Sequence, residues 1–163
     1  MLILVRRFVV VAALMFWSGG FVFYAAVVVP IGTEILGGST EQGFITRHVA
    51  KRINWAGVAA LAMFAWDACS ADRRWRRGFR WASIGVMLAC LIVLLWLHPH
   101  MEALMPAGKH DGFVDFEHFD DLHRVYLWTI TVQWAASVGY MALSIAAWRG
   151  QDRHGHLDEQ PSQ

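Results

Sequence analysis

The feature that most constrains this chain is a charge-free apolar run near its beginning. Arg6 and Arg7 precede this run, which extends from Phe8 to Thr33 without an acidic or basic residue. About 20 apolar residues are enough for a helix to cross the hydrocarbon core of a bilayer. The run therefore predicts a first transmembrane helix, which we expect Pro30 and Gly32 to end. It carries no clear small-residue cleavage site after a short apolar core, so we expect an uncleaved helix rather than a signal peptide.

The composition of the whole chain agrees with a membrane protein. With 56% hydrophobic and 17% charged residues, the chain is too apolar for an ordinary soluble domain. We expect one transmembrane domain at residues 1–150 and a polar tail at residues 151–163. The two cysteines, Cys69 and Cys90, lie in or beside apolar segments and imply no disulfide framework. Nothing in the sequence supports nucleic-acid binding.

The apolar segments predict an all-α fold, a bundle of four transmembrane helices. The predicted spans cover about residues 8–31, 53–71, 81–97 and 125–148. Asp67 falls within the second span, where an unpaired charge in hydrocarbon would cost several kcal/mol. We expect Asp67 to lie near the headgroups and to pair there with Arg73 or Arg74.

Small residues at four-residue spacing predict helix-packing faces. Gly85 and Ala89 form such a pair in the third span, and Ala135 and Gly139 form one in the fourth. The segment 18–20, Ser-Gly-Gly, predicts a similar close approach of another helix to the first span.

The distribution of basic residues predicts the topology. The densest basic cluster follows the second span, and cytoplasmic loops carry an excess of Lys and Arg. It consists of Arg73, Arg74, Arg76, Arg77 and Arg80. With this loop and both termini in the cytoplasm, nine of the 14 lysines and arginines fall inside. We expect a bacterial cytoplasmic (inner) membrane protein with an extracytoplasmic loop between the third and fourth spans.

A short interfacial helix is predicted between the first two spans. Ser39 is followed three residues later by Gln42, which is the spacing of a capping box at a helix start. Phe44, Ile45 and Val49 then share one face, so we expect one or two amphipathic turns at the membrane surface that lead into the second span.

Histidines accumulate on the predicted outer side. Neutral imidazole is a common ligand for zinc, copper and haem iron, so this accumulation raises a metal hypothesis. The six residues are His48, His98, His100, His110, His118 and His123. Their spacing along the chain does not match a known metal signature.

Helical geometry selects His123 as the inward-facing histidine. If the helix begins at about Phe116, one stripe faces the bundle, whereas Asp115, His118 and Asp121 lie on wetter faces. The residues of this stripe are Phe116, Phe119, His123, Tyr126, Ile130, Gln133 and Ser137.

Two interpretations of the histidines stay open. In the first, His123 is a structural histidine with a hydrogen-bond partner and the other histidines are solvated or interfacial. In the second, His123 and His98, together with His100 or His48, bind a transition metal or ligate a haem at the outer leaflet.

Several short motifs resemble a known family. They are Gly19-Gly20 with Phe23 and Pro30, Glu41-Gln42-Gly43-Phe44-Ile45-Thr46 followed by Asn54, Pro99, and Phe119 followed by Leu122-His123-Arg124. Together they resemble small bacterial multi-pass membrane proteins related to eukaryotic transmembrane protein 205. This resemblance implies a four-helix fold and no reaction. Tyr126 and Ile130 stand where that family typically has a serine and an asparagine, which puts any transfer of function through this helix in doubt.

The chain is also distantly similar to copper-resistance-type four-helix membrane proteins and to haem-associated membrane oxidases, by fold alone. The sequence contains no nucleophile motif, phosphate-binding glycine loop or pair of intramembrane carboxylates. We therefore expect a non-enzymatic membrane bundle with an extracytoplasmic histidine-rich cap, which contacts the lipid bilayer and acts through a homo-oligomer or another membrane protein. The alternative is a metal-handling or redox membrane protein.

Overall fold

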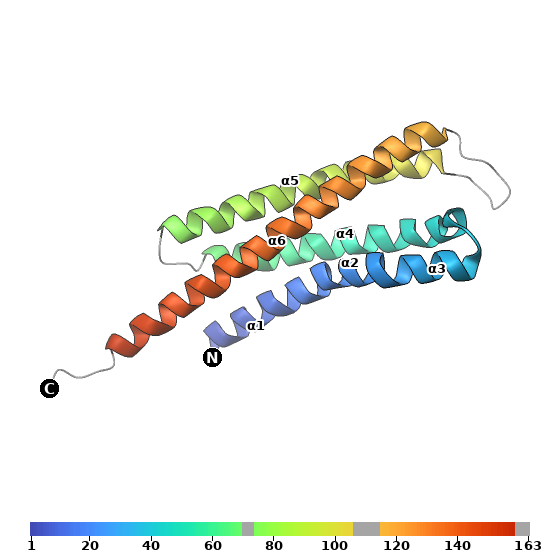
Figure 1. Cartoon of the computed structure of the whole chain (residues 1–163). Helices are drawn as coiled ribbons and strands as arrows, with labels where there is room; N and C mark the ends of the chain where they lie inside the picture. The colour runs from blue at the N-terminus through green and yellow to red at the C-terminus, as the bar shows by residue number, and fades with distance from the viewer. Residues whose placement is uncertain (70–73, 106–114, 159–163) are drawn as a thin grey trace.

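Four long helical segments run back and forth along one axis in the computed structural model, which describes residues 1–69, 74–105 and 115–158 (Figure 1). The first segment comprises α1 (Leu2–Leu14), the π-helical turn η1 (Met15–Gly19), α2 (Gly20–Phe23), the π-helical turn η2 (Tyr24–Val28) and α3 (Val29–Leu36). The others are α4 (Ser39–Cys69), α5 (Arg74–Leu104) and α6 (Phe116–Asp158). The start of α1 and the end of α6 lie at the same end of the bundle. The predicted all-α architecture with four helices is confirmed.

The first segment was predicted to end at Pro30 and Gly32, and this prediction is wrong. The segment continues to Leu36, and Gly37 in the left-handed conformation (φ 84°) ends it. Pro30 is tolerated because it lies in the first turn of α3, directly after η2, where a missing backbone N–H matters least.

The fourth element begins where the helix-start pattern predicts, at Ser39. Gln42 does not complete a capping box, however, because its side-chain amide is buried and donates to the hydroxyl of Tyr24. From Ser39 the chain continues in one helix to Cys69. The predicted interfacial helix is therefore the first part of α4 rather than a separate element.

Three of the four segments are long and apolar enough to cross a membrane. They are Leu2–Leu36, Arg77–Leu104 and Phe116–Asp152. In α4, Arg52, Asn54 and Asp67 interrupt the apolar residues and lower its mean hydropathy.

The buried faces of α5 and α6 follow the alternating three- and four-residue spacing that is typical of coiled coils. On α5 the buried residues are Arg80, Ile84, Met87, Leu91, Leu94 and Leu97. On α6 they are Ile130, Gln133, Ser137, Tyr140, Ser144, Ala147 and Trp148. The buried face of α6 therefore carries polar side chains over most of its length.

The small-residue faces predicted for packing point outward instead. Gly85, Ala89, Ala135 and Gly139 are all exposed. A Cβ on Gly85 or Gly139 would meet no atom within 4 Å, and the same holds for Gly19 and Gly20. These two pairs of small residues therefore do not mark helix interfaces.

Candidate functional site

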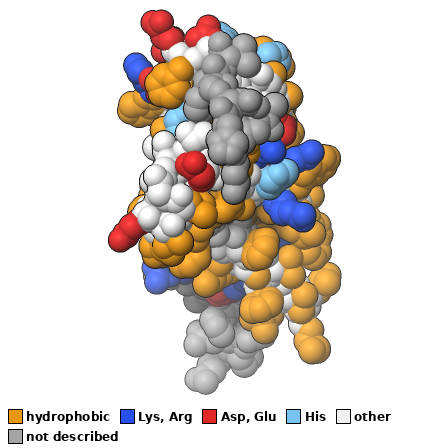
Figure 2. All heavy atoms as spheres, turned by 90° about the vertical axis from the view of Figure 1, so that its right-hand side faces the viewer, with side chains coloured by type: hydrophobic (Ala, Val, Ile, Leu, Met, Phe, Trp, Pro, Cys, Tyr) orange, Lys and Arg blue, Asp and Glu red, His pale blue; other side chains and the backbone are white. Residues whose placement is uncertain are grey.

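The histidines proposed as metal ligands lie at the end of the bundle opposite the start of α1. His98 and His123 are half-buried, whereas His48 and His100 are exposed. His48 of α4 lies near His98 of α5. The Nδ1 atom of His100 is 2.7 Å from the Trp96 carbonyl oxygen of the same helix. Figure 2 shows histidines at separate places on this end. His110 lies outside the described residues.

The structure brings no metal-binding cluster together among the residues that it describes. Among the side chains of residues 1–69, 77–105 and 115–152, no three His, Cys, Asp or Glu are grouped so that they could hold an ion. The imidazole of His123 packs against the ring of Phe119, with ring centroids 5.9 Å apart. The metal set His123, His98, His100 and His48 stays a prediction.

The stripe predicted on α6 is confirmed from Phe119 inward. Phe119, His123 and Tyr126 are half-buried, and the stripe then continues through the fully buried part of the helix. Phe116 departs from the prediction because its side chain is 64% exposed at the first turn. The wetter faces predicted for Asp115, His118 and Asp121 are confirmed, since all three side chains are exposed.

Polar side chains on different helices pair toward the end of the bundle that carries these histidines. Tyr126 of α6 lies beside the buried Asn54 of α4. Thr46 donates to the Gln42 carbonyl oxygen at 2.9 Å, so the hydroxyl of Tyr24, 3.0 Å from Thr46 Oγ1, donates to Thr46. The same tyrosine oxygen accepts from Gln42 Nε2 at 3.2 Å. These contacts hold the first segment and α6 against α4.

Gly32 makes a close contact in this region. A Cβ at residue 32 would collide with the side-chain oxygen of Gln42. A side chain at this position would therefore force the buried Gln42 amide to move.

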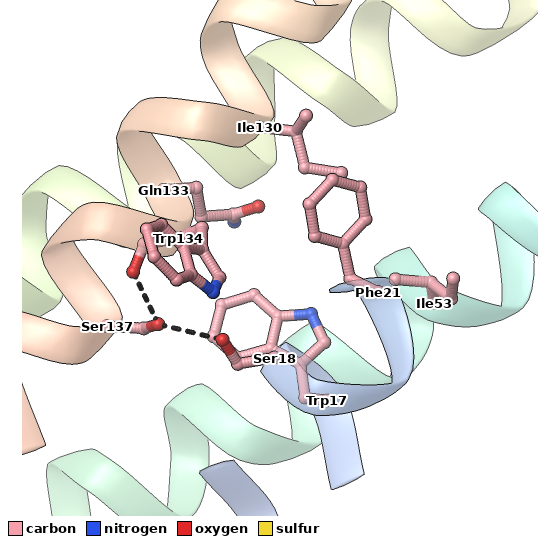
Figure 3. Close-up of a pocket in the computed structure, with 8 residues that line it drawn as sticks. All are labelled: Trp17, Ser18, Phe21, Ile53, Ile130, Gln133, Trp134 and Ser137. Carbon is pink, nitrogen blue, oxygen red and sulfur yellow. Dashed lines mark hydrogen bonds between the residues drawn. The ribbon is translucent and has the colours of Figure 1, made fainter. Parts of the chain in front are cut away.

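A small pocket lies in the middle of the bundle, beside η1 (Figure 3). Ser137 Oγ donates to the Trp134 carbonyl oxygen at 2.7 Å, so Ser18 Oγ, 3.2 Å away, donates to Ser137. Gln133 donates through Nε2 to the Met87 carbonyl oxygen at 3.1 Å, so this amide bridges α6 and α5. Trp17 closes the pocket from the first segment, and the remaining space suits about one water molecule.

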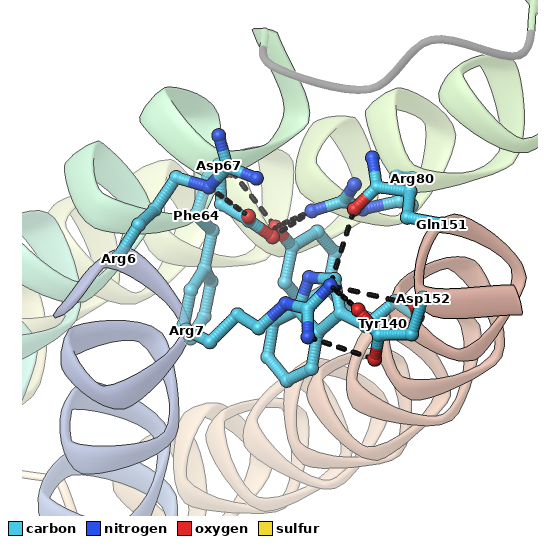
Figure 4. A network of polar contacts seen from close by, with 9 residues as sticks. Arg6, Arg7, Phe64, Asp67, Arg80, Tyr140, Gln151 and Asp152 are labelled. Atoms are coloured by element: carbon cyan, nitrogen blue, oxygen red, sulfur yellow. Dashed lines mark hydrogen bonds and ion pairs between the residues drawn. The ribbon is translucent and has the colours of Figure 1, made fainter. Parts of the chain in front are cut away.

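A buried charged network occupies the other end of the bundle (Figure 4). We call it the Asp67 network, and it consists of Arg6, Asp67, Arg80 and Tyr140. The Asp67 and Arg80 side chains are 1% and 2% exposed and form an ion pair. Arg6 Nε lies 3.1 Å from Asp67 Oδ1. Because the four residues lie on α1, α4, α5 and α6, the network connects all four segments.

Tyr140 links this network to the backbone of α4. Its hydroxyl accepts from Arg80 at 3.0 Å and donates to the Phe64 carbonyl oxygen at 2.8 Å. Its ring stacks on the ring of Phe64, with centroids 4.8 Å apart. The hydroxyl also lies 3.3 Å from Asp67 Oδ2. The fully buried Tyr140 side chain therefore contacts both the charged residues and the apolar core.

A second, more exposed ion pair lies beside the network. Arg7 binds both carboxylate oxygens of Asp152, at 2.8 and 3.0 Å. The Arg7 guanidinium also stacks over the ring of Trp148, 5.5 Å from its centroid. This contact ties the start of the first segment to the last part of α6.

Asp67 was expected to pair with Arg73 or Arg74 near the headgroups. Arg73 and the side chain of Arg74 lie outside what the structure describes. The ion pairs that the structure gives Asp67 are with Arg6 and Arg80, and they lie between helices rather than at the surface.

The sequence contained signals for Arg80 and Tyr140 that the prediction did not use. Tyr140 continues the α6 stripe three residues beyond Ser137. Arg80 lies four residues before the buried Ile84, on the same face of α5. Arg6 carried no such signal, because arginines commonly flank a transmembrane span.

The polar side chains inside the bundle join different helices. A charge inside a membrane costs several kcal/mol unless it is paired, and each charge of the Asp67 network faces an opposite one. The amides and hydroxyls in the middle of the bundle and toward its other end bridge pairs of helices. The interior polar groups therefore stabilise contacts between helices at the two ends and in the middle.

Residues 12–110 match a protein family described as "Domain of unknown function (DUF4149)". This range includes Asp67 and Arg80 and stops before α6. No curated protein and no solved structure matches the chain. Since the matched residues make up more than half of its length, the chain belongs to the DUF4149 family, whose function is unknown.

Proposed function

We propose that this protein is a non-enzymatic four-span bundle of the bacterial cytoplasmic membrane. Both termini lie in the cytoplasm, and a histidine-containing cap faces outward. The observation that carries the proposal is the Asp67 network, to which each of the four segments contributes one side chain. Length and apolar composition identify three of the four spans, and α4 is the remaining one. Pairing of Asp67 with two arginines allows α4 to cross the membrane as well, although its mean hydropathy is lower. The resemblance to relatives of transmembrane protein 205 supports the same arrangement.

Reporter fusions test the proposed topology. Green fluorescent protein fused after Gln163 should fluoresce, whereas alkaline phosphatase at the same position should be inactive, because its disulfides do not form in the cytoplasm. Alkaline phosphatase inserted at residue 110, between α5 and α6, should be active. The opposite pattern at either position would contradict the proposed topology.

The function of such a bundle is to bind a partner in the membrane, either a second copy or another membrane protein. Its interior is occupied by contacts between its own helices, which favours binding over chemistry. Chemical cross-linking in intact cells, followed by mass spectrometry of the purified full chain, should yield a specific cross-linked species. A chain that stays uncross-linked at native expression levels would contradict this role.

Metal or haem binding at the outer histidines is the second candidate. His48 lies within electrostatic range of His98, and His123 is half-buried, which favours a site shared by α4, α5 and α6. Metal analysis and an absorption spectrum of the purified protein test this candidate. Stoichiometric copper, zinc or iron, lost in His98→Ala and His123→Ala but kept in the exposed control His118→Ala, would support it. Absence of metal and of a Soret band would exclude it.

A further inference from the structure

The Asp67 network carries a surplus positive charge. Two guanidinium groups, those of Arg6 and Arg80, share the single carboxylate of Asp67. The two arginine side chains are only 13% and 2% exposed, so water compensates little of this surplus. A buried charge without a counter-charge is costly, because it has lost its hydration. A second anion at this place would therefore stabilise the network.

The other carboxylate at this end of the bundle is already engaged. Among the side chains that the structure describes, Asp152 is the only acidic residue there besides Asp67, and both of its oxygens bind Arg7. The Nε atom of Arg6 faces Asp67, and the structure gives the two terminal nitrogens of Arg6 no hydrogen bond to a described residue. Figure 4 shows one of them pointing away from the carboxylate. The network thus retains donors for an additional anion.

The network lies at the level where lipid headgroups are expected. Arg6 precedes the first predicted span by two positions, Arg80 directly precedes the third, and Arg149 directly follows the fourth. Trp66 and Trp81, the neighbours of Asp67 and Arg80 in the sequence, are 44% and 41% exposed. Exposed tryptophans are enriched at the headgroup level of a bilayer. Lipid phosphates are therefore anions within reach of the network.

The charges of the described side chains are divided unequally between the two ends of the bundle. At the end with the network, five arginines outweigh two aspartates by three charges. They are Arg6, Arg7, Arg77, Arg80 and Arg149, against Asp67 and Asp152. At the end with the histidines, seven acidic residues outweigh four basic ones, also by three charges. Anionic lipids are therefore attracted to the first end and repelled by the second.

Arg77 places an exposed guanidinium beside the network. It lies three residues before Arg80 on α5, and residues at this spacing are neighbours on a helix surface. Arg80 is buried in its contact with Asp67, whereas the side chain of Arg77 is exposed. A guanidinium matches a phosphate group well, because it donates two parallel N–H groups to two oxygens.

We propose that Arg6 and Arg77 bind the phosphate of one anionic phospholipid, which supplies the counter-charge that the Asp67 network lacks. Arg80 stays bound to Asp67 and Tyr140 and adds to the positive potential. Basic pockets between transmembrane helices bind anionic lipid headgroups in this way. The proposal requires a bilayer around the bundle, but it depends neither on which end faces the cytoplasm nor on a protein partner. Its failure would leave the proposed function untouched.

Selective retention of an anionic lipid tests the proposal. The full chain is reconstituted in vesicles of equal parts phosphatidylglycerol and phosphatidylethanolamine, extracted in mild detergent and measured by native mass spectrometry. Arg77→Gln removes the exposed donor, and Arg6→Gln removes the surplus charge. Arg52→Gln is the matched control, because Arg52 is an exposed arginine on the part of α4 nearer the histidines.

Wild type and Arg52→Gln should retain phosphatidylglycerol in preference to phosphatidylethanolamine. Arg77→Gln should lower this preference about fivefold, which is the effect of one arginine near anionic lipids, and Arg6→Gln should lower it at least as much. Equal retention of the two lipids by wild type would overturn the proposal. So would an unchanged preference in Arg77→Gln, or an equal loss in Arg52→Gln. Arg77 lies outside the network, so this variant keeps the test decisive even if Arg6→Gln does not fold.

Thermal unfolding in detergent separates a lipid headgroup from free phosphate. A ligand that binds the folded state raises the melting temperature. Phosphatidylglycerol should raise the melting temperature of wild type, with a smaller rise in Arg77→Gln, and inorganic phosphate at the same concentration should leave it unchanged. A rise of equal size with inorganic phosphate would overturn the assignment to a lipid.

Discussion

Asp67 of α4 and Arg80 of α5 form an ion pair in which neither side chain is more than 2% exposed. Arg6 approaches the same carboxylate from α1, and Tyr140 approaches it from α6. A buried charge that loses its partner is strongly destabilising, because the remaining charge has no water to solvate it. The stability of the whole bundle should therefore depend on this one carboxylate.

Asp67→Asn should destabilise the protein by about 3–5 kcal/mol, because it leaves two arginines without their carboxylate. Unfolding in detergent, followed by circular dichroism, measures this change. The matched control is Asp120→Asn, which removes the exposed ion pair between Asp120 and Arg124 on α6. The control should keep the wild-type melting temperature. Equal melting temperatures of the two variants would show that the Asp67 network does not stabilise the fold.

A double-mutant cycle between Asp67 and Arg80 should reveal strong coupling. Removing both partners eliminates the unpaired charge that each single variant leaves. Asp67→Leu combined with Arg80→Leu should thus be less destabilised than the sum of the single variants, by about 1–3 kcal/mol. Chemical denaturation of the four proteins in the same detergent gives the coupling free energy. Simple additivity would mean that Asp67 is held mainly by Arg6.

Gln133→Met should have a small effect, although the amide is buried at 3% exposure. Hydrogen bonds between transmembrane helices contribute about 0.6 kcal/mol on average and about 1.7 at most. Methionine fills a similar volume, so the loss of the bond to the Met87 carbonyl should lower stability by less than about 2 kcal/mol. Thermal unfolding measures this, with Thr131→Val on the exposed face of α6 as control. A larger loss would indicate that Gln133 also binds a structural water in the adjacent pocket.

Hydrophobic length and helix-start patterns were sufficient to predict the helices. Four segments were expected and four are present, and the start of α4 at Ser39 follows from its helix-start pattern. The end of the first segment was predicted wrongly because proline usually ends a helix. Here Pro30 follows a π-helical turn, and such a turn has no clear sequence signature.

The candidate site was harder to predict because its residues come from distant parts of the chain. The stripe on α6 was recognised up to Ser137, since 3.6-residue periodicity is local. The partners of Asp67 were not, because neighbouring arginines in the sequence offered a simpler pair. Only packing brings Arg6, 61 positions away in the sequence, to that carboxylate. The small-residue pattern is local but gave a wrong prediction, because Gly85 and Gly139 have the expected spacing and yet point outward.

Gly32→Ala should destabilise the contact between the first segment and α4. A Cβ at this position would collide with the side-chain oxygen of Gln42, and the buried amide would lose its place beside Tyr24. Overpacking of this kind costs about 1–3 kcal/mol. The control is Gly85→Ala, where nothing lies within 4 Å and alanine favours the helix by up to about 1 kcal/mol. In thermal unfolding, Gly32→Ala should melt below wild type and Gly85→Ala at or above it. The reverse order would mean that Gly85, and not Gly32, lies at a helix interface, as the four-residue spacing first suggested.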